Sequence, residues 1–164
     1  MIRNIVFKTL IDILFIFQGF GILGAFLTMP FGVTKINQIN LDVKEWSVTH
    51  WSLLALSLTA FIAFIIGIFF LRKVGRYLLS NQYFAIEVIK NLKKSGRFFI
   101  YTGIISLFVF IISLIVKVKS GNNLIYNTDM VLPIFIMVVG LFFVIQSEAL
   151  MISKHAKEDS DLTI

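Results

Sequence analysis

WSLLALSLTAFIAFIIGIFFL, residues 51–71, holds no charged side chain and little that prefers water. A helix rises about 1.5 Å per residue, so about 20 residues cross a hydrocarbon core of about 30 Å. Three further stretches without charge, residues 13–34, 98–116 and 130–147, are long enough to do the same. The sequence therefore predicts a single domain, 1–164, with four spans at about 11–33, 49–71, 98–118 and 130–152.

The spans are expected to be helices. Lipid offers the backbone no hydrogen-bonding partner, so only helices and closed barrels cross a membrane. Strands of a membrane barrel alternate apolar and polar residues, whereas the run from Phe61 to Leu71 is apolar on every side. The first span is expected to be a retained helix rather than a signal peptide, because its apolar run is too long for one. The predicted fold class is an all-α membrane protein, a four-transmembrane-helix bundle.

The composition excludes several classes of protein. Hydrophobic residues make up 58% of the chain, with 18 Phe, which exceeds what a soluble core needs. The absence of Cys and the presence of only two His argue against disulfides and against thiolate or zinc sites. No phosphate-binding loop, metalloprotease helix or nucleophile elbow is present. We therefore expect no enzyme activity, no cofactor and no metal.

The basic residues predict an orientation. Lys and Arg concentrate in the two tails and in the loop between the second and third spans, which places these segments in the cytoplasm by the positive-inside rule. These residues are Arg3, Lys8, Arg72, Lys73, Arg76, Lys90, Lys93, Lys94, Arg97, Lys154 and Lys157. The other two loops hold only Lys35, Lys44, Lys117 and Lys119. The net charge of +6 thus reflects basic residues that flank the spans, with the lipid bilayer as partner. No direct contact with nucleic acid is expected.

The middle loop carries an amphipathic pattern. As a short cytoplasmic helix over residues 81–95, it would gather one apolar stripe and end at Gly96. The stripe comprises Phe84, Ala85, Val88, Ile89 and Leu92. Such a helix either lies on the lipid surface or docks a cytoplasmic partner, and the pattern does not separate the two. In the outer loops, residues 39–43 and 124–126 are each compatible with a short strand or with irregular loop.

Six polar residues lie toward the cytoplasmic side of the spans and form the candidate polar cluster. They are Asp12, Gln18, Arg72, Arg76, Arg97 and Glu148. The two carboxylates stand at comparable height to the arginines, so charge-assisted hydrogen bonds are expected, and Glu148 is expected to turn inward toward a basic residue or Gln18. Such pairs either fix helix register or mark a site. Gly21 and Ala25 have the spacing of small residues that permits close helix approach.

The C-terminal stretch supports a resemblance. It places Glu148 in the last helix, follows it with Glu158 and Asp159, and ends in Asp161, Leu162, Thr163 and Ile164. In this tail, and in the connector residues Tyr83, Phe84, Val88, Leu92 and Gly96, the chain resembles a family of uncharacterised bacterial four-span membrane proteins described only as a domain of unknown function. The resemblance implies a bacterial cytoplasmic membrane location and, by gene neighbourhood, a small helix-turn-helix regulator as partner.

Two functions remain open at this point. The first is a membrane sensor or adaptor whose connector and tail residues, Asp161 to Ile164, bind the regulator. The second is a small transporter, channel or immunity-type protein that uses the polar cluster. A homo-oligomer is compatible with either function.

Overall fold

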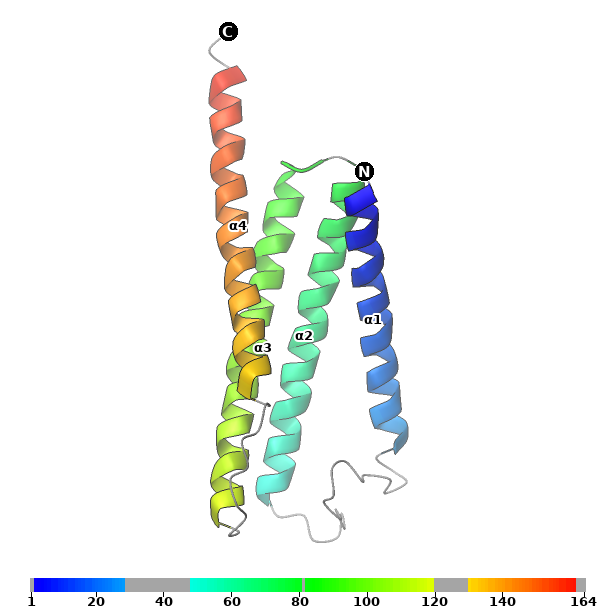
Figure 1. Ribbon diagram of the computed structural model, residues 1–164, viewed down its shortest axis with the longest axis vertical. Coiled ribbons are helices and arrows are strands. Elements are labelled where there is room, and N and C mark those ends of the chain that lie inside the picture. Colours follow the sequence, from blue (N-terminus) through cyan, green and yellow to red (C-terminus); the bar gives the residue numbers. More distant parts are fainter. Residues whose placement is uncertain (1, 29–47, 81, 120–129, 162–164) are drawn as a thin grey trace.

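The computed structural model describes residues 2–28, 48–80, 82–119 and 130–161, which form four long helices (Figure 1). They are α1 (Ile2–Thr28), α2 (Val48–Leu79), α3 (Ile86–Lys119) and α4 (Val131–Asp161). Within these ranges no residue belongs to a strand, so the predicted all-α fold with four helices is confirmed. The strand pairing considered for residues 39–43 and 124–126 lies outside the described residues.

Each helix contains a stretch long and apolar enough to cross a membrane. These stretches are Ile2–Gly21, Trp51–Leu79, Ile86–Ile115 and Val131–Ser160. Large apolar side chains cover the outside of the helices: Phe17 is 71% exposed and Phe108 is 60% exposed. Because such a surface is unfavourable in water and suited to acyl chains, the chain is a multi-pass membrane protein.

The helices pack in a row in chain order. The backbone of α2 lies against α1 and α3, and that of α4 lies against α3, while within the described ranges α1 and α4 do not meet. The start of α1, the turn between α2 and α3 and the end of α4 lie at one end of the molecule (Figure 1). We call this the terminal end. There α4 projects beyond the other three helices.

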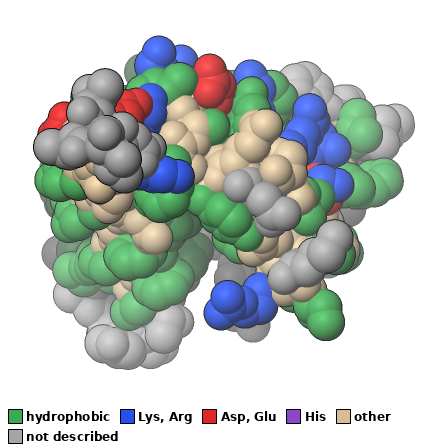
Figure 2. Space-filling view, turned by 90° about the horizontal axis from the view of Figure 1, so that it is seen from above, with side chains coloured by type: hydrophobic (Ala, Val, Ile, Leu, Met, Phe, Trp, Pro, Cys, Tyr) green, Lys and Arg blue, Asp and Glu red, His purple; other side chains and the backbone are tan. Residues whose placement is uncertain are grey.

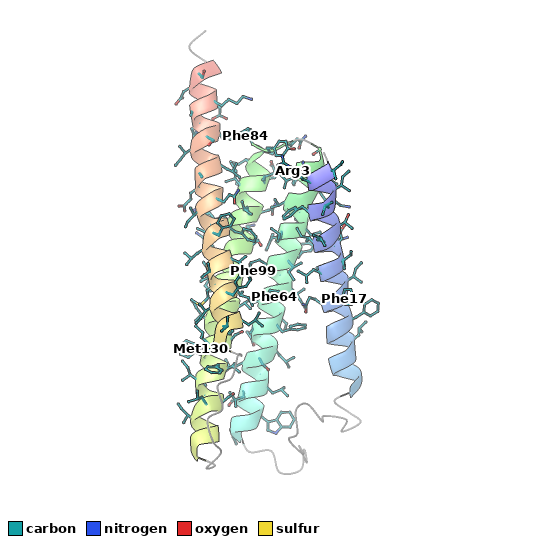
Figure 3. The ribbon with its side chains drawn as sticks, in the orientation of Figure 1. Arg3, Phe17, Phe64, Phe84, Phe99 and Met130 are labelled. Atoms are coloured by element: carbon teal, nitrogen blue, oxygen red, sulfur yellow. The ribbon has the colours of Figure 1, made fainter. Side chains whose placement is uncertain are left out.

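Most of the buried apolar residues lie where α2 and α3 meet. Ile68 and Val88 are 0% and 1% exposed, and Leu71, Val74, Leu92 and Phe99 belong to the same cluster. Deeper in the membrane, Phe64 and Phe99 face one another between α2 and α3 with ring centroids 5.5 Å apart, while Phe17 on α1 points away from the bundle (Figure 3). The core therefore extends from mid-membrane to the terminal end.

The expected short connector helix is not a separate element. α3 begins at Ile86 and runs without interruption through Gly96, so the helix end predicted at Gly96 is wrong. Val88, Ile89 and Leu92 are buried. These three residues of the apolar stripe thus pack in the bundle core, since a tight turn brings them against the last turns of α2, while Phe84 at the start of the stripe is 44% exposed.

Hydrogen bonds hold this turn and tie α1 to it. The backbone N–H of Gln82 donates to the carbonyl of Tyr77 at 3.2 Å, and that of Ala85 donates to Gln82 at 3.3 Å. From α1, the amide of Asn4 donates to the carbonyl of Leu78 at 3.0 Å and to the Tyr83 hydroxyl at 2.6 Å. These bonds therefore fasten α1, α2 and the turn to one another at the terminal end.

α3 and α4 approach each other closely at two glycines. A Cβ built on Gly96 would lie 2.6 Å from the carbonyl oxygen of Gly140, and one on Gly140 would lie 2.7 Å from that of Gly96. By contrast, nothing lies within 4 Å of a Cβ at Gly19, and the nearest atom to one at Gly21 is in the Phe61 ring at 3.7 Å. The small residues that permit backbone contact are thus those of α3 and α4 rather than those of α1.

Candidate functional site

The predicted polar cluster is divided between two helix pairs. On α1 and α2, the guanidinium of Arg72 donates from Nε to Oδ1 of Asp12 at 2.5 Å, and Nζ of Lys8 lies 3.2 Å from Oδ2. The Arg72 guanidinium also lies 5.2 Å from the centre of the Phe15 ring. The pair is half-buried, so it fixes the register of α1 against α2.

The second pair joins α3 to α4. Nζ of Lys93 donates to Oε1 of Glu148 at 3.2 Å, so Glu148 has the basic partner expected for it. The expectation that it turns inward is wrong, because its side chain is 59% exposed. The inward position at this level of α4 belongs to the preceding residue. Ser147 is fully buried, and its hydroxyl donates to the carbonyl of Val144 at 2.7 Å.

The remaining members of the cluster do not join either pair. Arg97 is exposed on α3, Gln18 is half-buried on α1, and Arg76 lies on α2 beside an open cleft. Because α1 and α4 are not in contact, the two carboxylates cannot act on one ligand in this arrangement. Two cations of these pairs were not in the predicted cluster. Lys8 lies on α1, as Asp12 does, and Lys93 lies on α3, the neighbour of α4.

A cleft beside Arg76 lies at the terminal end and is lined mainly by charged and polar residues. Its volume is about 580 Å³, and it lies between the last turns of α2, the turn, and the first turns of α3. Its lining residues are Lys73, Arg76, Tyr77, Ser80, Gln82, Glu87 and Asn91. Sequence reasoning missed this cleft, although the spacings 73–76–80 and 87–91 place each set on one helix face.

Basic side chains are spread over the terminal end. Figure 2, which views the molecule from this end, shows Lys and Arg over several parts of the surface with fewer acidic side chains between them. Some rest on aromatic rings. Nζ of Lys73 lies 4.7 Å from the centre of the Phe69 ring, and Nζ of Lys94 lies 5.3 Å from that of Phe70. Such contacts hold the ammonium groups at the edge of the apolar surface.

The acidic tail proves to be helical. α4 continues through Glu158 and Asp159 to Asp161, while Leu162, Thr163 and Ile164 lie outside the described residues. The Glu158 carboxylate lies 3.5 Å from Nζ of Lys154 and 3.5 Å from Nδ1 of His155. These (i, i+4) and (i, i+3) contacts support the last turns of the helix.

The described parts of the chain hold no group of three or more His, Cys, Asp or Glu side chains arranged to bind a metal ion. The polar residues are instead paired between helices or arranged around the cleft. The features with functional potential are thus the cleft and the projecting end of α4.

No curated protein and no solved structure is similar enough to match. One family model does match, over residues 35–164. The matched region begins after α1 and includes α2, α3 and α4 with the segments that join them. Since it covers most of the 164 residues, the chain belongs to the family described as proteins of unknown function (DUF2975).

Proposed function

We propose that this protein is a membrane-bound adaptor or sensor whose terminal end faces the cytoplasm and binds a small helix-turn-helix regulator there. The orientation is supported by the basic residues, because most of the Lys and Arg lie on the parts of the four helices at the terminal end: the start of α1, the end of α2, the start of α3 and the end of α4. A regulator tethered in this way would respond to events in the membrane or outside it.

The projecting end of α4 is the observation that carries this proposal. The uncharged stretch of α4 ends at Ser147, which marks the hydrocarbon boundary, and the helix continues to Asp161. At about 1.5 Å per residue it reaches about 20 Å past that boundary. From Ile152 to Ser160 every side chain except that of Lys154 is exposed. A membrane anchor alone does not require this rigid extension.

One face of the extension suits a protein partner. Ile152, His155, Ala156 and Asp159 are spaced to share a face, and Ile152 is 71% exposed. On a different face, Nζ of Lys157 lies 6.0 Å from the centre of the Phe84 ring in the turn, so that face rests on the bundle. An apolar anchor flanked by polar groups on an exposed helix is a common mode of recognition.

The alternative of a small transporter or channel has less support. It required the six polar residues to converge, and they do not: Asp12 and Arg72 pair between α1 and α2, Glu148 pairs with Lys93 between α3 and α4, and Arg76 lines the cleft. Gln18 and Arg97 join none of these groups. The spans also continue through the membrane as unbroken helices over their described lengths, whereas many transporters bind substrate at broken helices.

Co-purification tests the proposed function. Two variants of the full-length protein, one lacking residues 161–164 and one carrying Ile152→Ala with His155→Ala, should insert normally. Each should recover at least about tenfold less regulator from detergent extracts, because loss of a central contact typically costs more than 1 kcal/mol. Expression of the genes under that regulator should change in parallel.

Lys154→Ala is the matched control, since this side chain is half-buried on the face away from the proposed contact. It should recover the regulator as well as the unmodified protein does. Equal recovery of the regulator by all variants, with unchanged gene expression, would contradict the adaptor proposal.

A further inference from the structure

The cleft between α2 and α3 lies at the boundary between hydrocarbon and headgroups. On α2 the uncharged stretch ends at Leu71, and on α3 the next uncharged stretch begins at Phe98. The charged and polar lining residues all lie on the headgroup side of these two positions. The cleft is therefore at the depth of lipid phosphates, whichever way the protein faces.

Its cations are available to a ligand. Among the described residues, no carboxylate forms an ion pair with Lys73 or Arg76. The amide of Asn91, which lines the cleft from α3 and is half-buried, adds hydrogen-bonding capacity, and the half-buried side chain of Tyr77 lines the cleft from α2. Two cations with neutral donors nearby form a suitable environment for a phosphate group.

An aromatic surface continues from the cleft toward the membrane centre. Lys73 connects the two regions, because it lines the cleft while its Nζ lies 4.7 Å and 5.7 Å from the ring centres of Phe69 and Phe70. Phe70 stacks on Phe98 across the helix pair at 5.8 Å, and Phe98 meets Tyr101 at 6.4 Å. Phe69 is 39% exposed and Tyr101 is 55% exposed. A polar cleft above an exposed aromatic surface has the two-part chemistry of a phospholipid.

The charges in the cleft indicate which phospholipid fits. Lys73 and Arg76 bring two positive charges, and Glu87 brings one negative charge that no cation of the described residues neutralises. The net charge of one matches a single phosphodiester. Glu87 and Gln82 can accept hydrogen bonds from a hydroxylated headgroup, and so can Oγ of Ser80, whose proton is donated to the carbonyl of Tyr77 at 2.9 Å.

We propose that this cleft binds a singly charged anionic phospholipid with a hydroxylated headgroup, of the phosphatidylglycerol type. Lys73, Arg76 and Asn91 hold the phosphate, and Glu87, Gln82 and Ser80 meet the headgroup hydroxyls. One acyl chain lies along Phe70, Phe98 and Tyr101. The site is independent of the proposed regulator contact, which lies on the end of α4.

Native mass spectrometry of the detergent-solubilised, full-length protein tests this proposal. Phosphatidylglycerol and phosphatidylethanolamine are titrated separately, and the fraction of protein with lipid bound gives an apparent Kd. The protein should prefer phosphatidylglycerol. The double variant Lys73→Ala, Arg76→Ala should bind phosphatidylglycerol at least about tenfold more weakly. Each basic residue near an anionic headgroup lowers the apparent Kd by a factor somewhat below about ten, and two are removed.

Two further variants make the outcome specific. Lys90→Ala with Arg97→Ala removes the same net charge from exposed positions outside the cleft and should change the apparent Kd less than about twofold. Glu87→Gln removes the acid and should strengthen binding of phosphatidylglycerol, a gain that a misfolded protein could not produce. Adding millimolar inorganic phosphate should not displace the lipid.

The proposal is overturned if the two double variants weaken binding equally, since this would indicate diffuse attraction to the basic surface. It is also overturned if both lipids bind alike, or if inorganic phosphate displaces the lipid, which would identify a site for free anions.

Discussion

Leucine in place of Gly96 or Gly140 should separate α3 from α4 and lower the free energy of unfolding by about 3 kcal/mol or more, because the added side chain meets backbone that cannot move aside. A Cβ at Gly96 would lie 2.6 Å from the carbonyl oxygen of Gly140 and 2.9 Å from Cγ2 of Val144. Reversible unfolding in mixed micelles of a mild detergent and dodecyl sulfate, followed by tryptophan fluorescence, measures the change.

Gly19→Leu is the control for this pair. It places the same side chain on a membrane helix where nothing lies within 4 Å of the Cβ position. Its free energy of unfolding should stay within about 0.5 kcal/mol of that of the unmodified protein. If Gly96→Leu behaved like Gly19→Leu, the close contact of α3 with α4 would be wrong.

The second large effect is expected at Ile68, a fully buried side chain of α2. Burial from lipid gains little hydrophobic free energy, so Ile68→Ala mainly opens a cavity and removes packing contacts. We expect a loss of about 1–3 kcal/mol, which is smaller than the loss of about 2–5 kcal/mol known for such substitutions in soluble cores.

Ile62→Ala on the same helix is the matched control, because Ile62 is 54% exposed toward lipid. It deletes the same atoms from a surface that acyl chains can refill, and its stability should change by less than about 0.5 kcal/mol. The same unfolding assay compares the two variants. Equal losses of unfolding free energy would contradict the structure, in which Ile68 faces the core and Ile62 faces lipid.

The number and type of the helices could be predicted because charge-free length is a direct consequence of bilayer thickness. The helix ends could not be predicted as well. A separate connector helix was expected over residues 81–95, whereas α3 begins at Ile86 and continues through it, because an apolar stripe such as Val88, Ile89 and Leu92 has the same pattern whether it faces lipid or α2.

The polar cluster illustrates a second limit. Sequence position gives the depth of a residue in the membrane, and on that basis Asp12, Arg72 and Glu148 were expected together. The depth of a residue does not determine which helices are neighbours. Because the helices pack in a row, Asp12 pairs with Arg72 and Glu148 pairs with Lys93. Gly140 was overlooked for the same reason, since its role exists only in relation to Gly96.

In the proposed orientation, the four membrane helices place both chain ends and the turn between α2 and α3 in the cytoplasm. The protein has no native Cys, so single Cys residues can be introduced at Asn37, Ser80, Asn122 and Ser160 without background. In intact cells, a thiol reagent that cannot cross the membrane should label the proteins with Cys at 37 and 122 only. All four should react after the cells are opened. Labelling at position 80 or 160 in intact cells would contradict the orientation, and with it the adaptor proposal.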